Sequence, residues 1–380
     1  MKKIISILLA AALLLTLTAC AKLIEEPEPE EIEYTYVPRT KRNGFQVALL
    51  VTGDLEDEES VFRYAEAGLR QVEEEKRIDL EVIELGDAGK NKENWLQTLD
   101  ETAKSKDYDI IICGTREITD VLCEAAYHNP QQKFVVIDDG SHAGEYFNVL
   151  NLTYKVNELG YLAGVLAASA AREKMPSYSE EGCMIGFLSG ESSDEADEYL
   201  IGYIEGALSV DRFARVDVRS MEGKGNQMLS KLFAEKMIAD NACSVIWNAA
   251  GTAGIGAAEA AAENGEVWYI GSGRDQELTL PEELAARTLT SGYKNITGSM
   301  VWLFNELDAD REYWGQEVEL GLAQSGVVLV TDKNYQTLVS DKTRDAVDEA
   351  RKMIIKGDVV VHSHNSAGVS FIGLVDSVRP

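Results

Sequence analysis

The chain has 380 residues, and its 65 Asp and Glu against 36 Lys and Arg give a formal net charge of −29. Such an acidic chain is repelled by phosphates, which argues against nucleic acid as a partner and against electrostatic attachment to an anionic membrane. The length exceeds what one compact core normally holds, so more than one lobe is expected.

The first twenty residues have the order of a secretory leader. Lys2 and Lys3 are followed by an apolar stretch, Ile4–Leu17, and by small residues that lead to Cys20. The apolar stretch is shorter than the about 20 residues that span a bilayer. The ending resembles bacterial lipoprotein signals, in which the cysteine receives a diacylglyceryl group and becomes the first mature residue. We expect residues 1–19 to be a signal peptide and Cys20 to be the lipidation site; the alternative is an ordinary cleaved leader.

A spacer follows the leader. Residues 21–43 are rich in Glu and Pro and poor in aliphatic residues, so they cannot bury enough surface to fold alone. We expect residues 20–43 to be a disordered acidic tether, which Pro and like charge keep extended.

Beyond the tether, short β-branched runs alternate with amphipathic helical stretches, which is typical of parallel sheets covered by helices. The predicted strands are Gln46–Val51, Leu80–Ile83, Asp109–Cys113, Phe134–Ile137, Met184–Leu188, Val216–Arg219, Ser244–Trp247 and Val267–Gly271. Helical periodicity covers a stretch from Phe62 to Val72 and the ranges Asn94–Lys104, Glu117–His128, Glu158–Arg172, Ala196–Leu208, Gln227–Ala239, Ile255–Asn264, Ile296–Leu307 and Arg344–Ile355.

These elements form two successive β/α sets, each the size of one domain. We predict a first lobe of residues 44–150 plus about 294–310, and a second lobe of residues 151–293 plus about 311–380. In open α/β sheets ligands bind at the carboxyl ends of the strands. A ligand cleft between the two lobes is therefore expected.

No pattern of covalent chemistry or metal binding stands out. Cys113, Cys123, Cys183 and Cys243 lie in apolar or small-residue settings and are interpreted as buried thiols. His362 and His364, two apart in a predicted strand, would share one face and could bind a metal, but no third ligand lies nearby, so surface histidines are the preferred interpretation. We expect no enzyme activity, no cofactor and no metal.

Several segments in order resemble the basic membrane protein family of bacterial substrate-binding lipoproteins, whose best known members are PnrA-like purine-nucleoside receptors of ABC transporters. The matching segments are Val47–Val51 with the acidic turn Asp57–Ser60, the Y-L-A-G helix at Tyr161–Gly164, Ile185–Phe187 with Gly202–Gly206, the run Val245–Gly256, Asp275-Gln276, and Leu289–Ser291 with Lys294.

The resemblance implies a type I periplasmic-binding fold, with two doubly wound parallel-sheet lobes that close on a small solute. It implies a receptor on the extracytoplasmic face of the cell membrane that delivers a nucleoside-like ligand to an ABC permease. The alternative is a sensory or regulatory lipoprotein of the same fold, with lost or altered ligand binding, that acts through a protein partner.

In the family the base lies between two aromatic rings, and Trp247 falls on the second of these positions. Asn248 and the glycine turn that begins at Gly251 follow it at a strand's carboxyl end, where backbone N–H groups can approach a ligand. The alternative is that Trp247 plugs the core. Lys294 matches a family lysine that faces the ligand, or else is a surface lysine.

The remaining family positions carry other residues in this chain. Val61 lies where the family has its first aromatic ring. Either Phe62 or Tyr64 supplies that ring from a shifted helix start, or the ligand slot has an aromatic ring on one side only. Phe62 also begins an apolar core stripe.

The two family aspartates that hold sugar hydroxyls align with Thr52 and Gly273. Asp54, Asp57 or Asp275 could substitute for them.

Overall fold

The computed structural model describes residues 44–57, 60–86, 88–175, 181–221, 225–364, 366 and 370–380. The predicted signal peptide, Cys20 and the tether lie outside these described residues. None of the helices in the described part of the chain is long and apolar enough to cross a bilayer.

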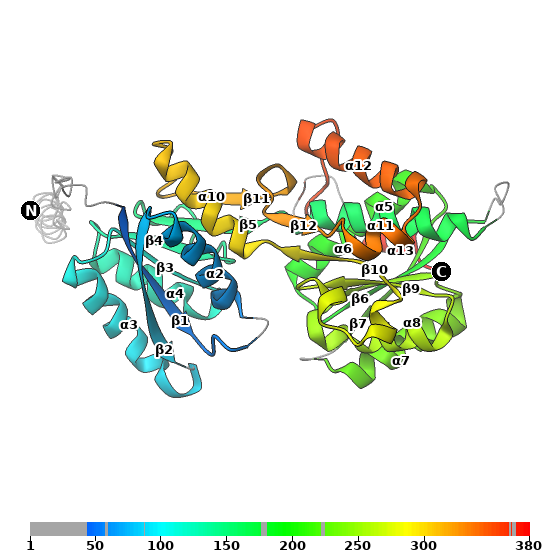
Figure 1. Ribbon diagram of the computed structural model, residues 1–380, viewed down its shortest axis with the longest axis horizontal. Helices are drawn as coiled ribbons and strands as arrows, with labels where there is room; N and C mark the ends of the chain where they lie inside the picture. Colours follow the sequence, from blue (N-terminus) through cyan, green and yellow to red (C-terminus); the bar gives the residue numbers. More distant parts are fainter. Residues whose placement is uncertain are drawn as a thin grey trace, which may run out of the picture. The chain divides into compact units, whose positions relative to one another are not determined.

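The first sheet contains six parallel strands in the order β11-β5-β4-β3-β1-β2 (Figure 1). Its strands are β1 (Phe45–Thr52), β2 (Ile78–Gly86), β3 (Ile110–Gly114), β4 (Lys133–Ile137), β5 (Val149–Tyr154) and β11 (Glu317–Leu320). The central strands are near-continuous apolar runs because helices cover both faces of such a sheet.

The second sheet has the order β12-β10-β9-β8-β6-β7, with only the β10–β12 pair antiparallel. Its strands are β6 (Met184–Ser189), β7 (Arg215–Ser220), β8 (Val245–Ala249), β9 (Trp268–Ser272), β10 (Thr288–Lys294) and β12 (Val327–Leu329). The eight strands from Gln46–Val51 to Val267–Gly271 that the sequence predicted are confirmed, with small differences at their ends.

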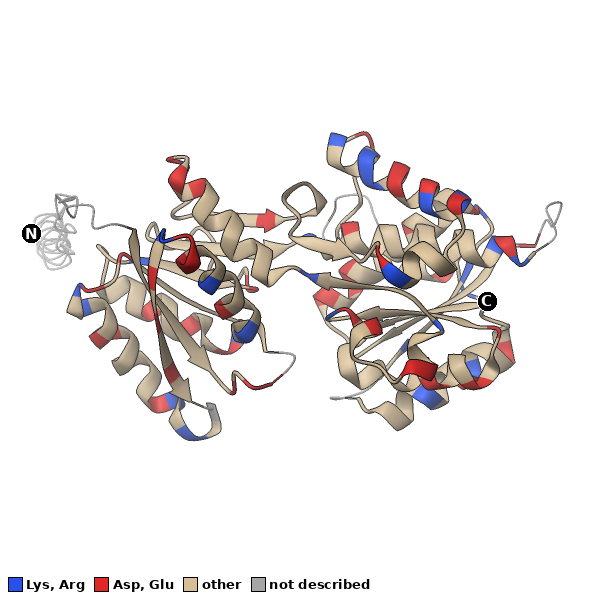
Figure 2. Ribbon diagram, viewed as in Figure 1, with Lys and Arg blue, Asp and Glu red and all other residues tan. Residues whose placement is uncertain are grey.

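Helices cover both sheets, and most of their charged residues lie away from the strands (Figure 2). Those of the first sheet are α2 (Val61–Glu74), α3 (Ala88–Ser105), α4 (Arg116–His128) and α10 (Ile296–Asp308). The others are α5 (Val156–Glu173), α6 (Asp194–Val210), α7 (Gln227–Asn241), α8 (Gly256–Asn264), α9 (Glu282–Ala285), α11 (Lys333–Leu338), α12 (Asp341–Lys356) and α13 (Phe371–Ser377), with the 3₁₀ turns Gly251–Gly254, Gln276–Leu278 and Leu322–Gln324.

Helices α5 and α6 pack backbone against backbone. A Cβ at Gly164 would lie 2.1 Å from the carbonyl oxygen of Tyr203, and one at Gly202 would lie 2.0 Å from that of Asn157. No side chain fits at such distances, so glycine is required at both positions. At the start of α6, Ser193 caps the first turn by accepting a hydrogen bond from the backbone N–H of Ala196.

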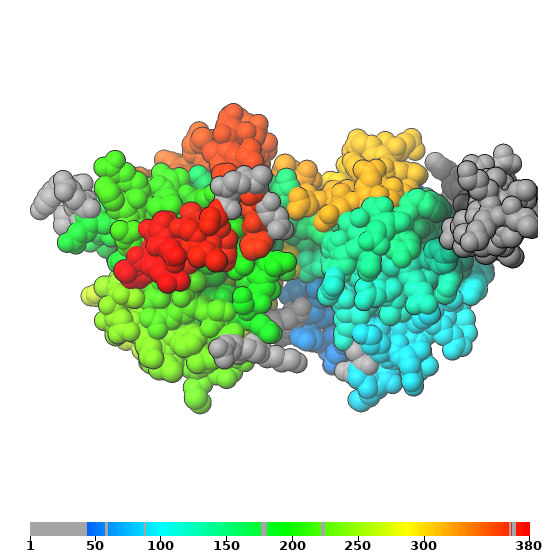
Figure 3. Space-filling model, turned by 180° about the vertical axis from the view of Figure 1, so that it is seen from behind, coloured from blue at the N-terminus to red at the C-terminus, as the bar shows by residue number. Residues whose placement is uncertain are grey.

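The predicted strand around His362 and His364 is wrong. Residues Val359–His364 form no strand and lie instead along α6, where Glu205 Oε1 is 2.6 Å from Nδ1 of His362 and Glu198 accepts from the backbone N–H of His364. Side-chain partners on α6 thus take the place of a neighbouring strand. The C-terminal helix α13 then lies over α6 (red on green in Figure 3).

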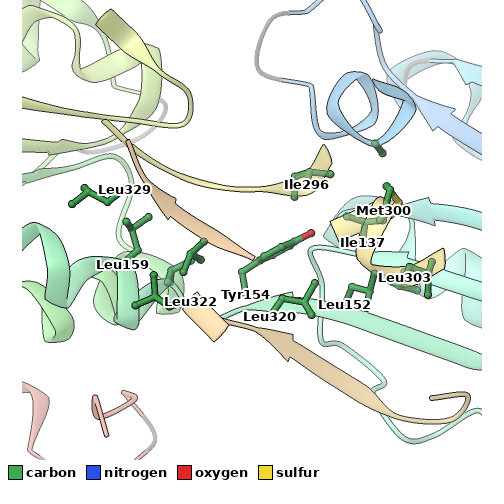
Figure 4. Close-up of a cluster of buried hydrophobic side chains, with 14 of the residues drawn as sticks. Ile137, Leu152, Tyr154, Leu159, Ile296, Met300, Leu303, Leu320, Leu322 and Leu329 are labelled. Carbon is green, nitrogen blue, oxygen red and sulfur yellow. The ribbon is translucent and has the colours of Figure 1, made fainter. Parts of the chain in front are cut away.

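The chain passes between the two sheets three times, after β5, after β10 and between β11 and β12. Buried apolar side chains from these crossings and their neighbours, such as Tyr154, Leu320 and Leu329, form one cluster (Figure 4). The first sheet thus includes Asn151–Tyr154 and Glu317–Leu320, which the borders drawn from the sequence placed in the second lobe.

Candidate functional site

The carboxyl edge of the first sheet carries two residues in backbone conformations that non-glycine residues rarely adopt. Thr115, directly after β3, has φ 69° and ψ 151°, and Asp138, directly after β4, has φ 62°. Hydrogen bonds hold both: the N–H of Thr115 donates to the Ile137 carbonyl, and that of Asp138 donates to the Leu152 carbonyl. Backbone strain of this kind costs about 1–3 kcal/mol per residue and concentrates at ligand sites.

Lys294, the last residue of β10, lies at the centre of an ion triad that joins the two sheets. Its Nζ is 2.6 Å from Oδ2 of Asp138, beyond β4 of the first sheet, and 3.0 Å from Oε1 of Glu195, in the first turn of α6. The side chains of Lys294 and Asp138 are only 19% and 18% exposed. One ammonium and two carboxylates leave this triad with one net negative charge.

Burial and the neighbouring charges set the protonation of the triad. Burial raises the pKa of Asp138 to about 6, although Lys294 opposes the shift. Burial lowers the pKa of Lys294, but the carboxylates of Asp138 and Glu195 more than compensate and hold it well above its ordinary value. The ammonium is therefore charged throughout the physiological range, whereas Asp138 titrates near its lower end.

Trp247 is fully buried, with its indole enclosed by three other rings. The centroids of Phe187, Tyr199 and Tyr203 lie 5.5, 5.5 and 5.3 Å from that of Trp247. The ring thus offers no open face for stacking in this structure. Tyr199 is only partly buried. Burial is the largest cause that raises the pKa of its hydroxyl; Glu195 and Asp138 raise it further, and Lys294 lowers it. Tyr199 is therefore an aromatic ring that is close enough to the triad for all three of its charges to act on it.

Asn248 and Gly251 belong to a buried hydrogen-bond network at the carboxyl edge of the second sheet. Asn248 Nδ2 donates to the Gly251 carbonyl at 2.8 Å and to Tyr269 Oη at 2.7 Å, and its Oδ1 accepts from the N–H of Ala250. The N–H of Gly251 donates to Ser272 Oγ at 3.0 Å. The Asn248 side chain and the Gly251 N–H thus form hydrogen bonds within the protein and hold the turn in place. We call this hydrogen-bonded network the frame.

The residues predicted for the site at and after the end of β1 are not members of the ion triad. Phe62 is 3% exposed and packs in the core from the second position of α2, which supports its interpretation as a core residue. Thr52, the last residue of β1, is 7% exposed. Asp57 is exposed in the turn that follows.

Asp275, beyond β9, caps the turn Gln276–Leu278: its Oδ1 accepts from the N–H of Glu277, and its Oδ2 is 3.7 Å from Lys333 Nζ.

Of the residues predicted for the site, Lys294 is the one that the structure places in the ion triad. The sequence reasoning missed Asp138, Glu195 and Tyr199. One signal was present for Asp138, because an acidic pair follows the apolar strand Lys133–Ile137 directly. Glu195 and Tyr199 lie on a helix whose acidic and apolar pattern is that of any half-covered helix.

Thiol and metal chemistry are not organised in the described part of the chain. Cys113, Cys123, Cys183 and Cys243 are all buried free thiols, as predicted, and burial raises the pKa of each to about 12. Among the described residues, no group of three or more His, Cys, Asp or Glu side chains is arranged to hold a metal ion.

Comparison with known proteins identifies relatives along most of the chain. Residues 45–363 match the family described as ABC transporter substrate-binding protein PnrA-like. Basic membrane protein A of Borreliella burgdorferi is 26% identical over 330 residues, which cover 86% of this chain and 90% of that protein. An ABC transporter nucleoside-binding protein of Lactococcus lactis is 29% identical over 275 residues, which cover 69% and 73% of the two chains.

Solved structures of ABC transporter solute-binding proteins share the fold. One from Aeropyrum pernix superposes with a TM-score of 0.66 at 20% identity, over 88% of this chain and 97% of that chain. Another from Conexibacter woesei gives 0.63 at 17% identity, over 84% and 99%. The predicted fold class, two mostly parallel sheets with the architecture of periplasmic solute-binding proteins, is confirmed.

Proposed function

Because the chain belongs to the PnrA-like family of ABC transporter substrate-binding proteins, which are not enzymes, we propose that it binds a nucleoside or a closely similar polar ring compound and presents it to an ABC permease. The relative from Lactococcus lactis whose name states nucleoside binding supports this ligand class. The observation that carries the proposal is the ion triad of Asp138, Lys294 and Glu195, which joins the carboxyl ends of the two sheets.

The chemistry of the triad suits a neutral hydroxylated ligand. The carboxylates of Asp138 and Glu195 accept hydrogen bonds from hydroxyl groups, and Lys294 donates to ring nitrogens or oxygens. These carboxylates supply the charged acceptors that Thr52 and Gly273 lack. The partly buried ring of Tyr199, backed by Trp247, offers a surface on which a flat base can stack. The net negative charge of the triad disfavours nucleotides, whose phosphates it would repel.

The ligand proposal is tested by thermal unfolding of the full chain with nucleosides, free bases, sugars and nucleotides. A bound ligand at 100 times its Kd stabilises the protein by about 2.7 kcal/mol. We expect nucleosides to raise the melting temperature and nucleoside monophosphates to raise it less. No shift with any member of the panel would favour a regulatory protein of the same fold.

We also propose that Cys20 carries the lipid that holds the protein on the extracytoplasmic face of the membrane. The leader before it, with two lysines, an apolar stretch and small residues, supports this assignment. Two acyl chains are sufficient for stable attachment. Mass spectrometry of the mature N-terminus and fractionation of Cys20→Ala test it: we expect the variant in the soluble fraction, and an unmodified Cys20 would refute the proposal.

A further inference from the structure

An aromatic surface lies at the amino edge of the first sheet, opposite the carboxyl edge that carries Asp138. Two of its side chains are among the most exposed large hydrophobic residues: Tyr127 is 74% exposed and Phe147 is 59% exposed. Three partly buried rings extend it. We call this surface the aromatic edge; it consists of Tyr127, Phe147, Trp302, Tyr313 and Trp314.

The aromatic edge is continuous, although its members come from four parts of the chain. Asn148 Nδ2 donates to the Ala126 carbonyl at 3.1 Å, which brings Phe147 beside Tyr127 at the end of α4. A Cβ at Gly315 would lie 3.0 Å from the Cα of Phe147, so Trp314 lies next to it.

The rings of Tyr313 and Trp302 stack with centroids 5.8 Å apart. The edge thus runs from α4 through the turn before β5 and the turn before β11 to α10.

The tether joins the folded part at the same edge. β1 begins at Phe45, whose ring lies 5.9 Å from that of Phe304 on α10. Residues 21–43 separate this point from Cys20 and, even fully extended, reach roughly 80 Å. A lipid on Cys20 therefore keeps the amino edge at a high local concentration near the bilayer.

The composition of the edge fits the headgroup region of a bilayer. Trp and Tyr favour that region because each has an apolar ring and a polar group that stays hydrated. The charges nearby do not favour anionic lipid: acidic residues follow along the carboxyl end of α10 (Figure 2), and Glu306 is paired with Arg311 and Tyr313. The Lys133 ammonium lies 5.2 Å from the Trp314 ring centroid. The favoured surface is thus zwitterionic.

We propose that the aromatic edge rests in the headgroup region of the membrane that holds the lipid anchor, so that the first sheet stands with its amino edge on the bilayer. The proposal depends on the proposed lipidation of Cys20. It adds an orientation to the anchored receptor, since a tether alone would let the folded part tumble.

Tryptophan fluorescence tests this contact directly. The lipidated full chain is placed in phosphatidylcholine vesicles with and without brominated acyl chains, which quench nearby indoles. Trp95 and Trp247 are fully buried and Trp268 lies on the second sheet, so quenching would report Trp302 and Trp314. We expect clear quenching, reduced by roughly half in the double variant Tyr127→Ser/Phe147→Ser because the edge loses its most exposed rings. Replacing the phosphatidylcholine with phosphatidylglycerol at low salt should weaken the quenching.

Two controls keep the outcomes distinct. Leu278→Ser removes an exposed apolar side chain, 65% exposed, beyond β9 of the second sheet and should leave the quenching unchanged. Trp314→Phe keeps the packing and should remove much of the quenching signal. This control remains informative even if the double variant unfolds. Vesicle flotation separates the two proposals: a chain that does not float refutes the anchor. If the chain floats but its tryptophans are not quenched, or are quenched only when a membrane protein is present, the proposed contact between the aromatic edge and lipid is wrong.

Discussion

The carboxyl edges of the two sheets are built in opposite ways. At the second-sheet edge Asn248 is hydrogen-bonded to Gly251, Ala250 and Tyr269, so the turn after β8 is held by an uncharged network within the protein. The first-sheet edge holds strained backbone at Thr115 and Asp138 and a carboxylate whose pKa burial raises to about 6. Lys294 joins the second sheet to that carboxylate. The difference therefore indicates that a rigid frame on the second sheet faces a charged edge of the first sheet that responds to pH.

The largest expected effect is at the core of the rigid frame. Trp247→Ala removes a fully buried indole from among three rings and should lower the free energy of unfolding by about 3–5 kcal/mol. Urea unfolding followed by circular dichroism measures it. Trp268→Ala, at a partly buried ring at the start of β9, serves as the matched control and should cost less. An equal loss in both variants would contradict a special role for the aromatic cluster.

The hydrogen-bond network of the frame should respond next. Asn248→Ala leaves the N–H of Ala250 and the carbonyl of Gly251 without that side chain, and we expect a loss of about 2–3 kcal/mol. The same urea titration measures it, with Asn264→Ala on α8 as a control that should change stability little. If Asn248→Ala leaves the free energy of unfolding unchanged, the turn does not depend on this network.

The responsive edge should reveal itself through pH. The folded state raises the pKa of Asp138 from 3.8 to about 6, so it binds a proton more tightly than the unfolded chain. Relative to Asp138→Asn, the wild-type chain should gain on the order of 2 kcal/mol as the pH falls from about 7 to about 4.

That gain is fully present below the unfolded pKa and is lost as the pH rises through about 6. Denaturant titrations of both proteins across this range measure it. A difference between the two proteins that does not change with pH would mean that Asp138 titrates normally in the fold.

The smallest expected effect concerns backbone strain. Thr115→Gly relieves the conformation at φ 69° and ψ 151°, and the relief exceeds the entropic cost of glycine, so we expect stabilisation by about 0.5–1 kcal/mol. Thr98→Gly, in the helical part of α3, should instead destabilise by a similar amount. If both substitutions destabilise, Thr115 is not strained.

The fold could be predicted from the sequence because each strand is a local run of apolar residues, such as Val47–Val51 and Ile110–Cys113. The sequence predicted the site less well because the site depends on distant contacts. Lys294 and Asp138 are 156 positions apart, and no local pattern announces their pairing. Trp247 ends the strand predicted from the sequence, which suggested an open ring, but it lies in the middle of β8 (Val245–Ala249). Its burial follows from Tyr199 and Tyr203 on α6, which the glycine contacts draw close to α5.

The measurement that tests the account most directly is calorimetric titration of the full chain with a purine nucleoside, compared with Lys294→Met and with Lys342→Met, an exposed lysine of α12. We expect the nucleoside to bind the wild-type chain and the Lys342→Met control alike. Lys294→Met should weaken binding at least about tenfold, because it removes a charged hydrogen-bond donor. Equal affinity in Lys294→Met, or no binding to any of the three proteins, would contradict the account.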